Sequence, residues 1–193
     1  MGTLNAAGKF QAAFFQSVTT RTAGFASISQ SGLTNGSKLL ASMLMIIGGS
    51  PAGTAGGIKT TTVAVLLLTA ISVLRGNKDT ECYGRKITFE IIRVGITITL
   101  VTFVFWLFGV TVMTVIEPQQ KVLDLMFEAT SAMATVGLTA DLTPVLSDIS
   151  HVVLMLMMYI GRIGPMTMAL IFSGHVDKKN QFRTLPEAKI MVG

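Results

Sequence analysis

The chain contains both long and short apolar runs. Val94–Ile116 holds 23 residues without a charge, which is long enough for a helix to cross about 30 Å of hydrocarbon. Val152–Phe172 has a similar length but carries Arg162 among its apolar residues. Two shorter runs, Phe10–Val18 and Val122–Ala134, fall below the roughly 17 residues that a spanning helix needs. We therefore expect the short runs to enter the apolar layer as helices and to return.

The longest apolar stretch, Leu39–Leu74, is interrupted at its centre. It has 36 residues with one charge, Lys59, and a straight helix of that length would span about 54 Å. Residues 48–57 read GGSPAGTAGG, which disfavours a helix because each glycine costs about 1 kcal/mol and the proline about 3 kcal/mol. A broken backbone at membrane depth is tolerated only where it is buried in protein or lines an aqueous cavity. We expect two half-helices joined by a functional break.

The composition assigns these runs to a membrane protein. Half of the 193 residues are hydrophobic and 13% are charged, against about 25% charged in typical soluble domains. The net charge of +5 does not indicate a nucleic-acid partner, because Lys and Arg flank apolar runs instead of forming one basic face. By the positive-inside rule, residues 75–86 and the basic C-terminal tail are predicted to be cytoplasmic. The acidic segment 117–150 is then outside, and the single cysteine, Cys82, is cytoplasmic and reduced.

A shift of 113 residues superimposes one part of the chain on another. The paired positions keep their order and are similar in type: Phe14 and Phe127, Thr22 and Thr135, Gly24 and Gly137, Ser37 and Ser150, Gly48 and Gly161. Each unit reads as a short apolar helix, a Thr-x-Gly loop and a helix broken near its middle. We divide the chain on this basis into two domains, residues 1–86 and residues 87–193. Only the second unit is preceded by a long helix.

The Thr-x-Gly loops offer the chemistry that a cation needs when it leaves water. Backbone carbonyls replace hydration without formal charge, so an ion binds and can still leave. Glycine permits the backbone angles that direct carbonyls inward, and the carboxyl end of a preceding helix carries about half a negative charge. Asp124 and Glu128 fall in the first turns of the second short helix, where acids suit the positive end of the dipole. We predict a cation filter in which both loops share one axis; for either loop alone, a structural glycine corner is the alternative.

Four linked motifs resemble those of the Trk/Ktr/HKT potassium transporter family, most closely the KtrB-type membrane subunit. The matching segments are FQSVTTRTAGF at 15–25, GGSPAGTAGGIKTTT at 48–62, FEATSAMATVGLT at 127–139 and YIGRIGPMT at 159–167. The family implies an all-α integral membrane fold in which four repeats of outer helix, re-entrant pore loop and inner helix surround one pore. This chain would supply the third repeat without its first helix and the complete fourth. We interpret it as the C-terminal half of such a protein, and thus half of a pseudo-four-fold pore, from a fragment or a truncated gene.

The resemblance also implies functional residues at matching positions. Potassium would be coordinated by the backbone carbonyls of six filter residues: Thr22, Ala23, Gly24, Thr135, Val136 and Gly137. The broken helix would act as a gate below the filter, which the resemblance assigns to Gly48, Gly49, Gly53, Gly56, Gly57, Lys59 and an inner-helix arginine, Arg162. No other metal site is expected, because His151 and His175 lie at opposite ends of one predicted helix.

The implied function is potassium uptake across the plasma membrane by a multi-pass, channel-like protein with a cytoplasmic C-terminus. The family implies a homodimer of the full-length subunit, controlled by a cytosolic nucleotide-binding ring of the KtrA/TrkA type. We expect no enzyme activity and no cofactor, with K⁺ as the transported ion. Two alternatives stay open: a secondary transporter that holds a small solute between its broken helices, and a membrane fragment without transport activity.

Overall fold

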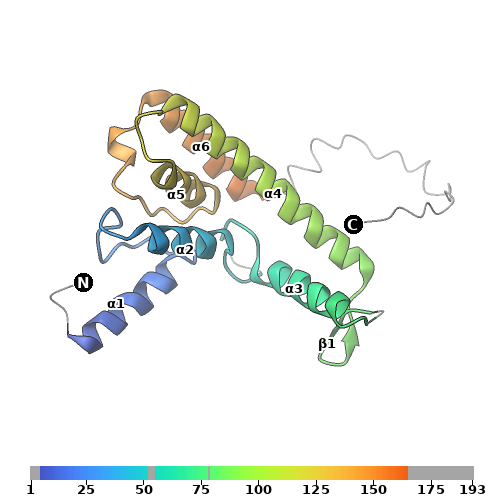
Figure 1. Cartoon of the computed structure of the whole chain (residues 1–193). Helices are drawn as coiled ribbons and strands as arrows, with labels where there is room; N and C mark the ends of the chain where they lie inside the picture. Colours follow the sequence, from blue (N-terminus) through green and yellow to red (C-terminus); the bar gives the residue numbers. More distant parts are fainter. Residues whose placement is uncertain (1–4, 52–54, 78, 165–193) are drawn as a thin grey trace, which may run out of the picture.

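The computed structural model describes residues 5–51, 55–77 and 79–164, and the description below concerns these residues. They are mostly helical (Figure 1). The elements in chain order are α1 (Ala6–Thr19), α2 (Asn35–Ile46), α3 (Thr60–Leu74), β1 (Glu81–Cys82), β2 (Arg85–Lys86), α4 (Phe89–Ile116), α5 (Val122–Met133), the short 3₁₀ helix η1 (Thr143–Val145) and α6 (Asp148–Ile163).

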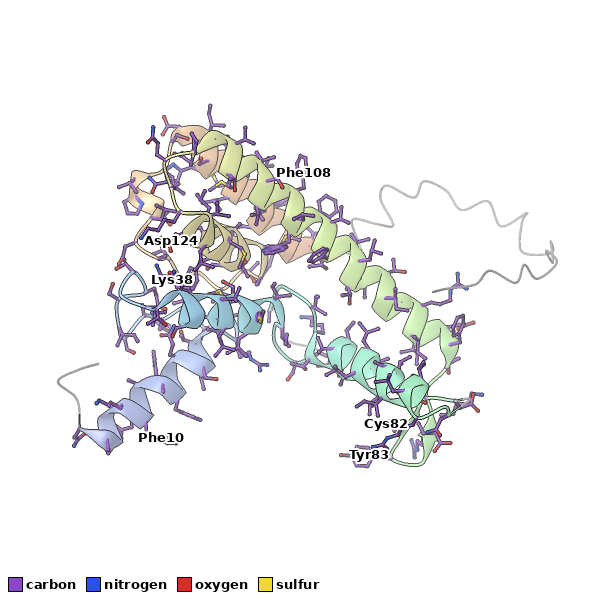
Figure 2. The ribbon with its side chains drawn as sticks, viewed as in Figure 1. Phe10, Lys38, Cys82, Tyr83, Phe108 and Asp124 are labelled. Atoms are coloured by element: carbon purple, nitrogen blue, oxygen red, sulfur yellow. The ribbon has the colours of Figure 1, made fainter. Side chains whose placement is uncertain are left out.

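The long helix α4 contains the predicted span and begins five residues before it. Its 28 residues give a length of about 42 Å. Among the described residues, α4 is the one helix that is long and apolar enough to cross a membrane. Large apolar side chains such as Phe108 point away from the rest of the protein along its outer face (Figure 2). This exposure fits a helix whose solvent is lipid.

The interrupted stretch forms two helices, as predicted. Helix α2 ends at Ile46, α3 starts at Thr60, and the connection turns back on itself before α3 continues alongside α4 (Figure 1). The Gly48 amide donates to the Ile58 carbonyl at 2.9 Å, and the Ile58 amide donates to the Ile46 carbonyl at 3.0 Å. A Cβ atom on Gly48 would overlap the Gly56 carbonyl oxygen, so this close approach of two chain segments requires glycine.

The centre of the fold is α5, which lies between α2 on one side and α4 and α6 on the other (Figure 1). Its C-terminal two thirds is buried almost completely. One apolar cluster joins α5 to α4 and α6, with Met113, Leu125 and Met157 among its members. A second joins α5 to α2 and to the loop after α5, through Met45 and Phe127. One of the two runs predicted to be too short to span therefore forms the best-packed helix.

Helix α6 differs from the predicted span Val152–Phe172. It begins earlier, because the Ser147 hydroxyl caps the Ser150 amide at 3.4 Å, and it ends at Ile163, where Gly164 takes a φ of +91°. Arg162 therefore lies in the last turn of this helix and not at its middle. Residues 165–172, His175 and the basic tail lie outside the described residues.

The predicted cytoplasmic loop contains a small antiparallel hairpin. Strands β1 and β2 are joined by a two-residue turn, Tyr83-Gly84, in which both residues have positive φ angles. Tyr83 is fully exposed at the tip, and Cys82 is half-buried on β1 (Figure 2).

Candidate functional site

The two Thr-x-Gly loops share left-handed backbone angles at their threonine and glycine positions. Thr22 and Thr135 adopt φ angles of 66° and 55°, and Gly24 and Gly137 adopt 74° and 89°. A left-handed threonine is disfavoured because of its β-branch, so its occurrence at both matching positions reflects a shared loop geometry. Each loop begins with a turn at the end of a short helix, and no strand is assigned to either loop.

The matching positions also share their helix caps. Thr34 caps α2 by accepting from the Ser37 amide at 3.3 Å, and Ser147 caps α6 in the same way. Both pairs of residues are related by the 113-residue shift. The repeat is thus visible in local geometry, while the division into domains 1–86 and 87–193 stays a prediction.

The structure brings the two loops into contact. A Cβ atom on Gly24 would overlap the Val136 carbonyl oxygen, so the first loop lies directly against the second. Gly137, by contrast, has open space where a side chain would stand. The Val136 amide donates to the Ser131 backbone carbonyl at 2.9 Å, and the Gly24 amide donates to the Thr19 backbone carbonyl at 3.2 Å. Each loop is therefore fixed to the C-terminal end of its own helix, where the dipole is negative.

The glycine-rich break contacts the second loop. The Gly56 amide donates to the Thr135 hydroxyl oxygen at 3.0 Å, and a Cβ on Gly56 would lie 2.6 Å from that oxygen. Lys59 donates to the Ala55 carbonyl at 2.6 Å, which ties the end of the break to its own backbone. Gly49 and Gly57 lie in the described part of the break, and Gly57 has a φ of +71°.

The predicted roles of two gate residues, Gly53 and Arg162, are not tested by the structure. Gly53 lies outside the described residues. The Arg162 side chain is exposed at the end of α6. Its neighbour Gly161 lies so close to α5 that a Cβ there would overlap the Met133 carbonyl oxygen. That Arg162 faces the break stays a prediction.

Glu128 has a different role from the one predicted for it. Its carboxylate is buried, with 4% exposure, and accepts hydrogen bonds from the Thr139 hydroxyl at 2.6 Å, the Ala140 amide at 2.9 Å and the Thr143 hydroxyl at 2.9 Å. These donors all lie after the second loop. The carboxylate therefore binds the segment after the second loop and not the amide groups at the amino end of α5. Periodicity in the sequence cannot identify such partners.

A charged pair joins the two units. Lys38 on α2 and Asp124 on α5 point toward each other, with 2.6 Å between Nζ and Oδ1 (Figure 2). The Lys38 side chain is 8% exposed and that of Asp124 20%. Sequence reasoning missed the pair, although single charges within apolar helices are a signal that each needs a partner.

Asp141 is an exposed residue that accepts two hydrogen bonds from the segment after the first loop. Its Oδ2 atom accepts from the Ser31 hydroxyl at 2.6 Å and from the Ser29 hydroxyl at 2.8 Å. These hydrogen bonds hold the pKa of Asp141 below its ordinary value. Likewise, hydrogen bonds from Ser147 and Ser150 hold the pKa of Glu117 below its ordinary value. Asp141 connects the segments that follow the two loops.

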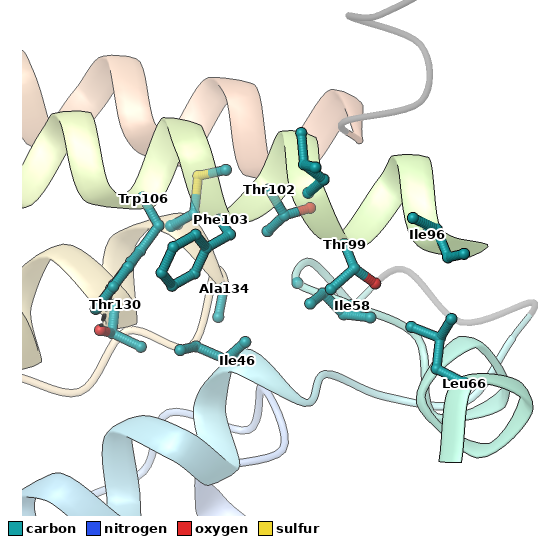
Figure 3. A pocket seen from close by; sticks show the side chains of 13 residues that line it. Ile46, Ile58, Leu66, Ile96, Thr99, Thr102, Phe103, Trp106, Thr130 and Ala134 are labelled. Carbon is teal, nitrogen blue, oxygen red and sulfur yellow. Dashed lines mark hydrogen bonds between the residues drawn. The ribbon is translucent and has the colours of Figure 1, made fainter. Parts of the chain in front are cut away.

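An apolar cavity of about 460 Å³ lies beside the break. Ile58 from the break, Ala134 from the end of α5 and Phe103 from α4 line it (Figure 3). On its wall, Trp106 donates to the Thr130 hydroxyl at 2.8 Å, which attaches α5 to α4. In the described parts of the chain, no three His, Cys, Asp or Glu side chains are placed to hold a metal ion.

A family model described as TrkH, cation transport protein, matches residues 1–183. The chain belongs to the TrkH family. The resemblance seen in the sequence motifs is thereby confirmed, and the helical fold is that of a membrane transport family. The relatives below bear names of uptake proteins and not of enzymes.

Three relatives of this TrkH-family chain have names that state what they take up. It is 36% identical to the Ktr system potassium uptake protein B of Bacillus subtilis, covering 100% of this chain and 42% of the relative. It is 37% identical to the potassium/sodium uptake protein NtpJ of Enterococcus hirae, covering 93% and 41%. It is 36% identical to the Ktr system potassium uptake protein B of Vibrio alginolyticus, covering 90% and 38%. The chain thus spans about two fifths of the length of these relatives.

Proposed function

We propose that this chain forms part of a potassium-uptake pore in the plasma membrane, with its Thr-x-Gly loops as two sides of the ion filter. The observation that carries this proposal is the contact of Gly24 with Val136 between loops that share positive φ angles at matching positions. Repeated loops that meet at one place are suited to surround an ion. The names of the relatives support potassium as that ion.

In the proposed filter, backbone carbonyls replace part of the water around K⁺. The contributing residues are Thr22, Ala23, Gly24, Thr135, Val136 and Gly137. Helices α1 and α5 are re-entrant in this proposal and direct their negative ends toward the ion. Because carbonyls carry no formal charge, the ion is held weakly enough to move on.

The proposed gate is the break between α2 and α3. Support comes from the Gly56–Thr135 hydrogen bond, which places the break against a filter residue. Lys59 stiffens the break through Ala55, and Arg162 approaches it from α6 in this proposal. Moving the break away from Thr135 would open the path below the filter.

The complete protein is proposed to act as a homodimer of multi-pass subunits with a cytoplasmic C-terminus. A cytosolic nucleotide-binding ring of the KtrA/TrkA type would control it. The support is limited to the names of relatives that belong to a Ktr system, which indicates several components for those proteins.

Uptake measurements test the filter. Expressed from its own gene in cells that lack potassium uptake, the protein should restore growth at low K⁺. Gly137→Ser should lower the preference for K⁺ over Na⁺, because serine strains a backbone at φ +89° although space for the side chain is present. Gly36→Ser is the matched control, since Gly36 is also open but lies in α2. No growth with the wild-type protein, or an unchanged preference in Gly137→Ser, would contradict the proposal.

A second variant tests the gate. Gly56→Val would place a side chain against Thr135 and Ala134, so we expect the break to be displaced and the flux of K⁺ to exceed that of the wild type. Ser50→Ala, an exposed change in the same break, should leave the flux unaltered. The measurement is ⁸⁶Rb⁺ uptake into vesicles that contain equal amounts of each variant. Equal flux in Gly56→Val and the wild type would refute the gate.

A further inference from the structure

Glu128 is a buried carboxylate that the proposed filter and gate do not use. It has 4% exposure, and neither ion pair recorded among the described residues involves it. A buried charge is costly unless hydrogen bonds satisfy it, and here three donors do so. Such a group needs a reason beyond packing, because an apolar residue of similar size would avoid the cost.

All three donors lie on one segment, directly after the second filter loop. Thr139 and Ala140 are the second and third residues beyond Gly137, and Thr143 follows in η1. The start of the loop is attached to α5 as well, through the Val136 amide and Ser131. The segment from the end of α5 to Ala140 is therefore tied to the same helix at both ends.

The burial pattern shows what this double attachment achieves. From residue 134 to residue 142, even-numbered residues are buried and odd-numbered ones are half-buried or exposed. The buried side chains of Val136, Leu138 and Ala140 pack with Phe127. The loop is thus stretched along α5 with one side in the core and the other side, including Gly137, open.

We propose that Glu128 is a positioning residue for the second filter loop, which it keeps extended at the spacing that selects K⁺. The proposal rests on the proposed function, because it assigns to Glu128 the geometry of that filter. Glu128 does not touch the ion; it acts through Thr139, Ala140 and Thr143.

The first loop contains a neutral counterpart. Gln16 on α1 and Gln30 exchange hydrogen bonds of 2.5 and 3.1 Å. Under the 113-residue shift Gln30 matches Thr143, and Gln16 follows Phe15, the residue that matches Glu128. Hydrogen bonds to an ionised group are roughly twice as strong as neutral ones. The carboxylate therefore holds the second loop more firmly than the amide pair holds the first.

The test uses the whole protein, purified and in cells, with two measurements. Hydrogen exchange reports the mobility of residues 135–143, and uptake reports the preference for K⁺ over Na⁺. Glu128→Ala removes the acceptor of the buried Ala140 amide and of the two half-buried threonine hydroxyls, so we expect faster exchange at 135–143 and a roughly tenfold loss of preference. Glu128→Gln keeps an acceptor oxygen at the same place, and should restore most of the preference. Gln16→Ala is the matched control: exchange should rise at 22–30 and not at 135–143.

Thr143→Val, which removes one donor at nearly constant volume, provides the same two measurements if Glu128→Ala does not accumulate. Faster exchange with unchanged ion preference overturns the proposal, because Glu128 would then be a structural brace alone. Unchanged exchange overturns it as well. A wild-type protein that carries no K⁺ defeats the proposed function, and the exchange measurement still shows separately whether Glu128 holds the loop.

Discussion

Phe14 and Phe127 occupy the same position in the two repeated units, yet their surroundings are opposite. Phe14 on α1 is 64% exposed, and Phe127 on α5 is 0% exposed. The residues after the filter glycines differ in the same way, with Phe25 at 72% exposure and Leu138 at 2%. Helix α5 is enclosed by α2, α4 and α6, whereas α1 buries only Thr19.

This comparison separates what a repeated sequence determines from what it leaves to its neighbours. Turn angles and helix caps agree between the units because they depend on a few adjacent residues. Burial differs because it depends on the elements that surround each helix. A matching sequence position therefore predicts local conformation but does not predict stability.

The largest expected effect comes from the phenylalanine pair itself. Phe127→Ala should lower the free energy of unfolding by about 3–5 kcal/mol, because it leaves a cavity between α5 and α2. Phe14→Ala should change it by less than about 0.5 kcal/mol, since the ring is mainly exposed. Thermal unfolding of both purified variants measures the difference. Equal losses of unfolding free energy in both variants would show that the two phenylalanines do not differ in their contribution to stability.

A pair of glycine substitutions should give a smaller loss of stability at one position and no loss at the other. Gly161→Ala forces a Cβ into the Met133 carbonyl, so we expect a loss of about 1–3 kcal/mol as α6 moves away from α5. Gly36→Ala in α2 meets open space, and alanine favours a helix, so this variant should be neutral or slightly more stable. Chemical denaturation of the two proteins is the measurement. A harmless Gly161→Ala would show that α5 and α6 are not closely packed.

The smallest effect concerns the link between the segments after the two loops. The pKa of Asp141 is lower in the folded than in the unfolded chain, so its hydrogen bonds stabilise the fold above the ordinary aspartate pKa. This contribution is lost as the pH falls through the lowered folded value. The melting temperature of the wild type should therefore exceed that of Asp141→Asn at about pH 6, and the two should converge below about pH 3.8. A constant difference across this range would mean that Asp141 does not link the segments as a carboxylate.

The sequence alone was sufficient for the existence of the helices, the break in Leu39–Leu74 and the family, but not for the bounds of α6. The lengths of the apolar runs and the glycine cluster are local signals, so they can be recognised in the sequence without knowledge of the fold. The partner of Lys38 lies 86 residues away, and the hydroxyl partners of Asp141 more than 100. Such pairs depend on how the helices pack together, and neither hydrophobic periodicity nor residue spacing in the sequence predicts that packing. The roles of the six filter residues and of the gate stay predictions.

The single hydrogen bond from Gly56 to Thr135 has a thermodynamic consequence for the proposed pore. A hydroxyl oxygen has two lone pairs, and one of them already accepts from the break. If K⁺ takes the same oxygen as a ligand, occupancy of the innermost binding position and placement of the break become linked equilibria. Reciprocity then requires that whatever the break does to ion affinity, the ion does to the break by the same factor. External potassium concentration would in that case act as an effector of its own passage.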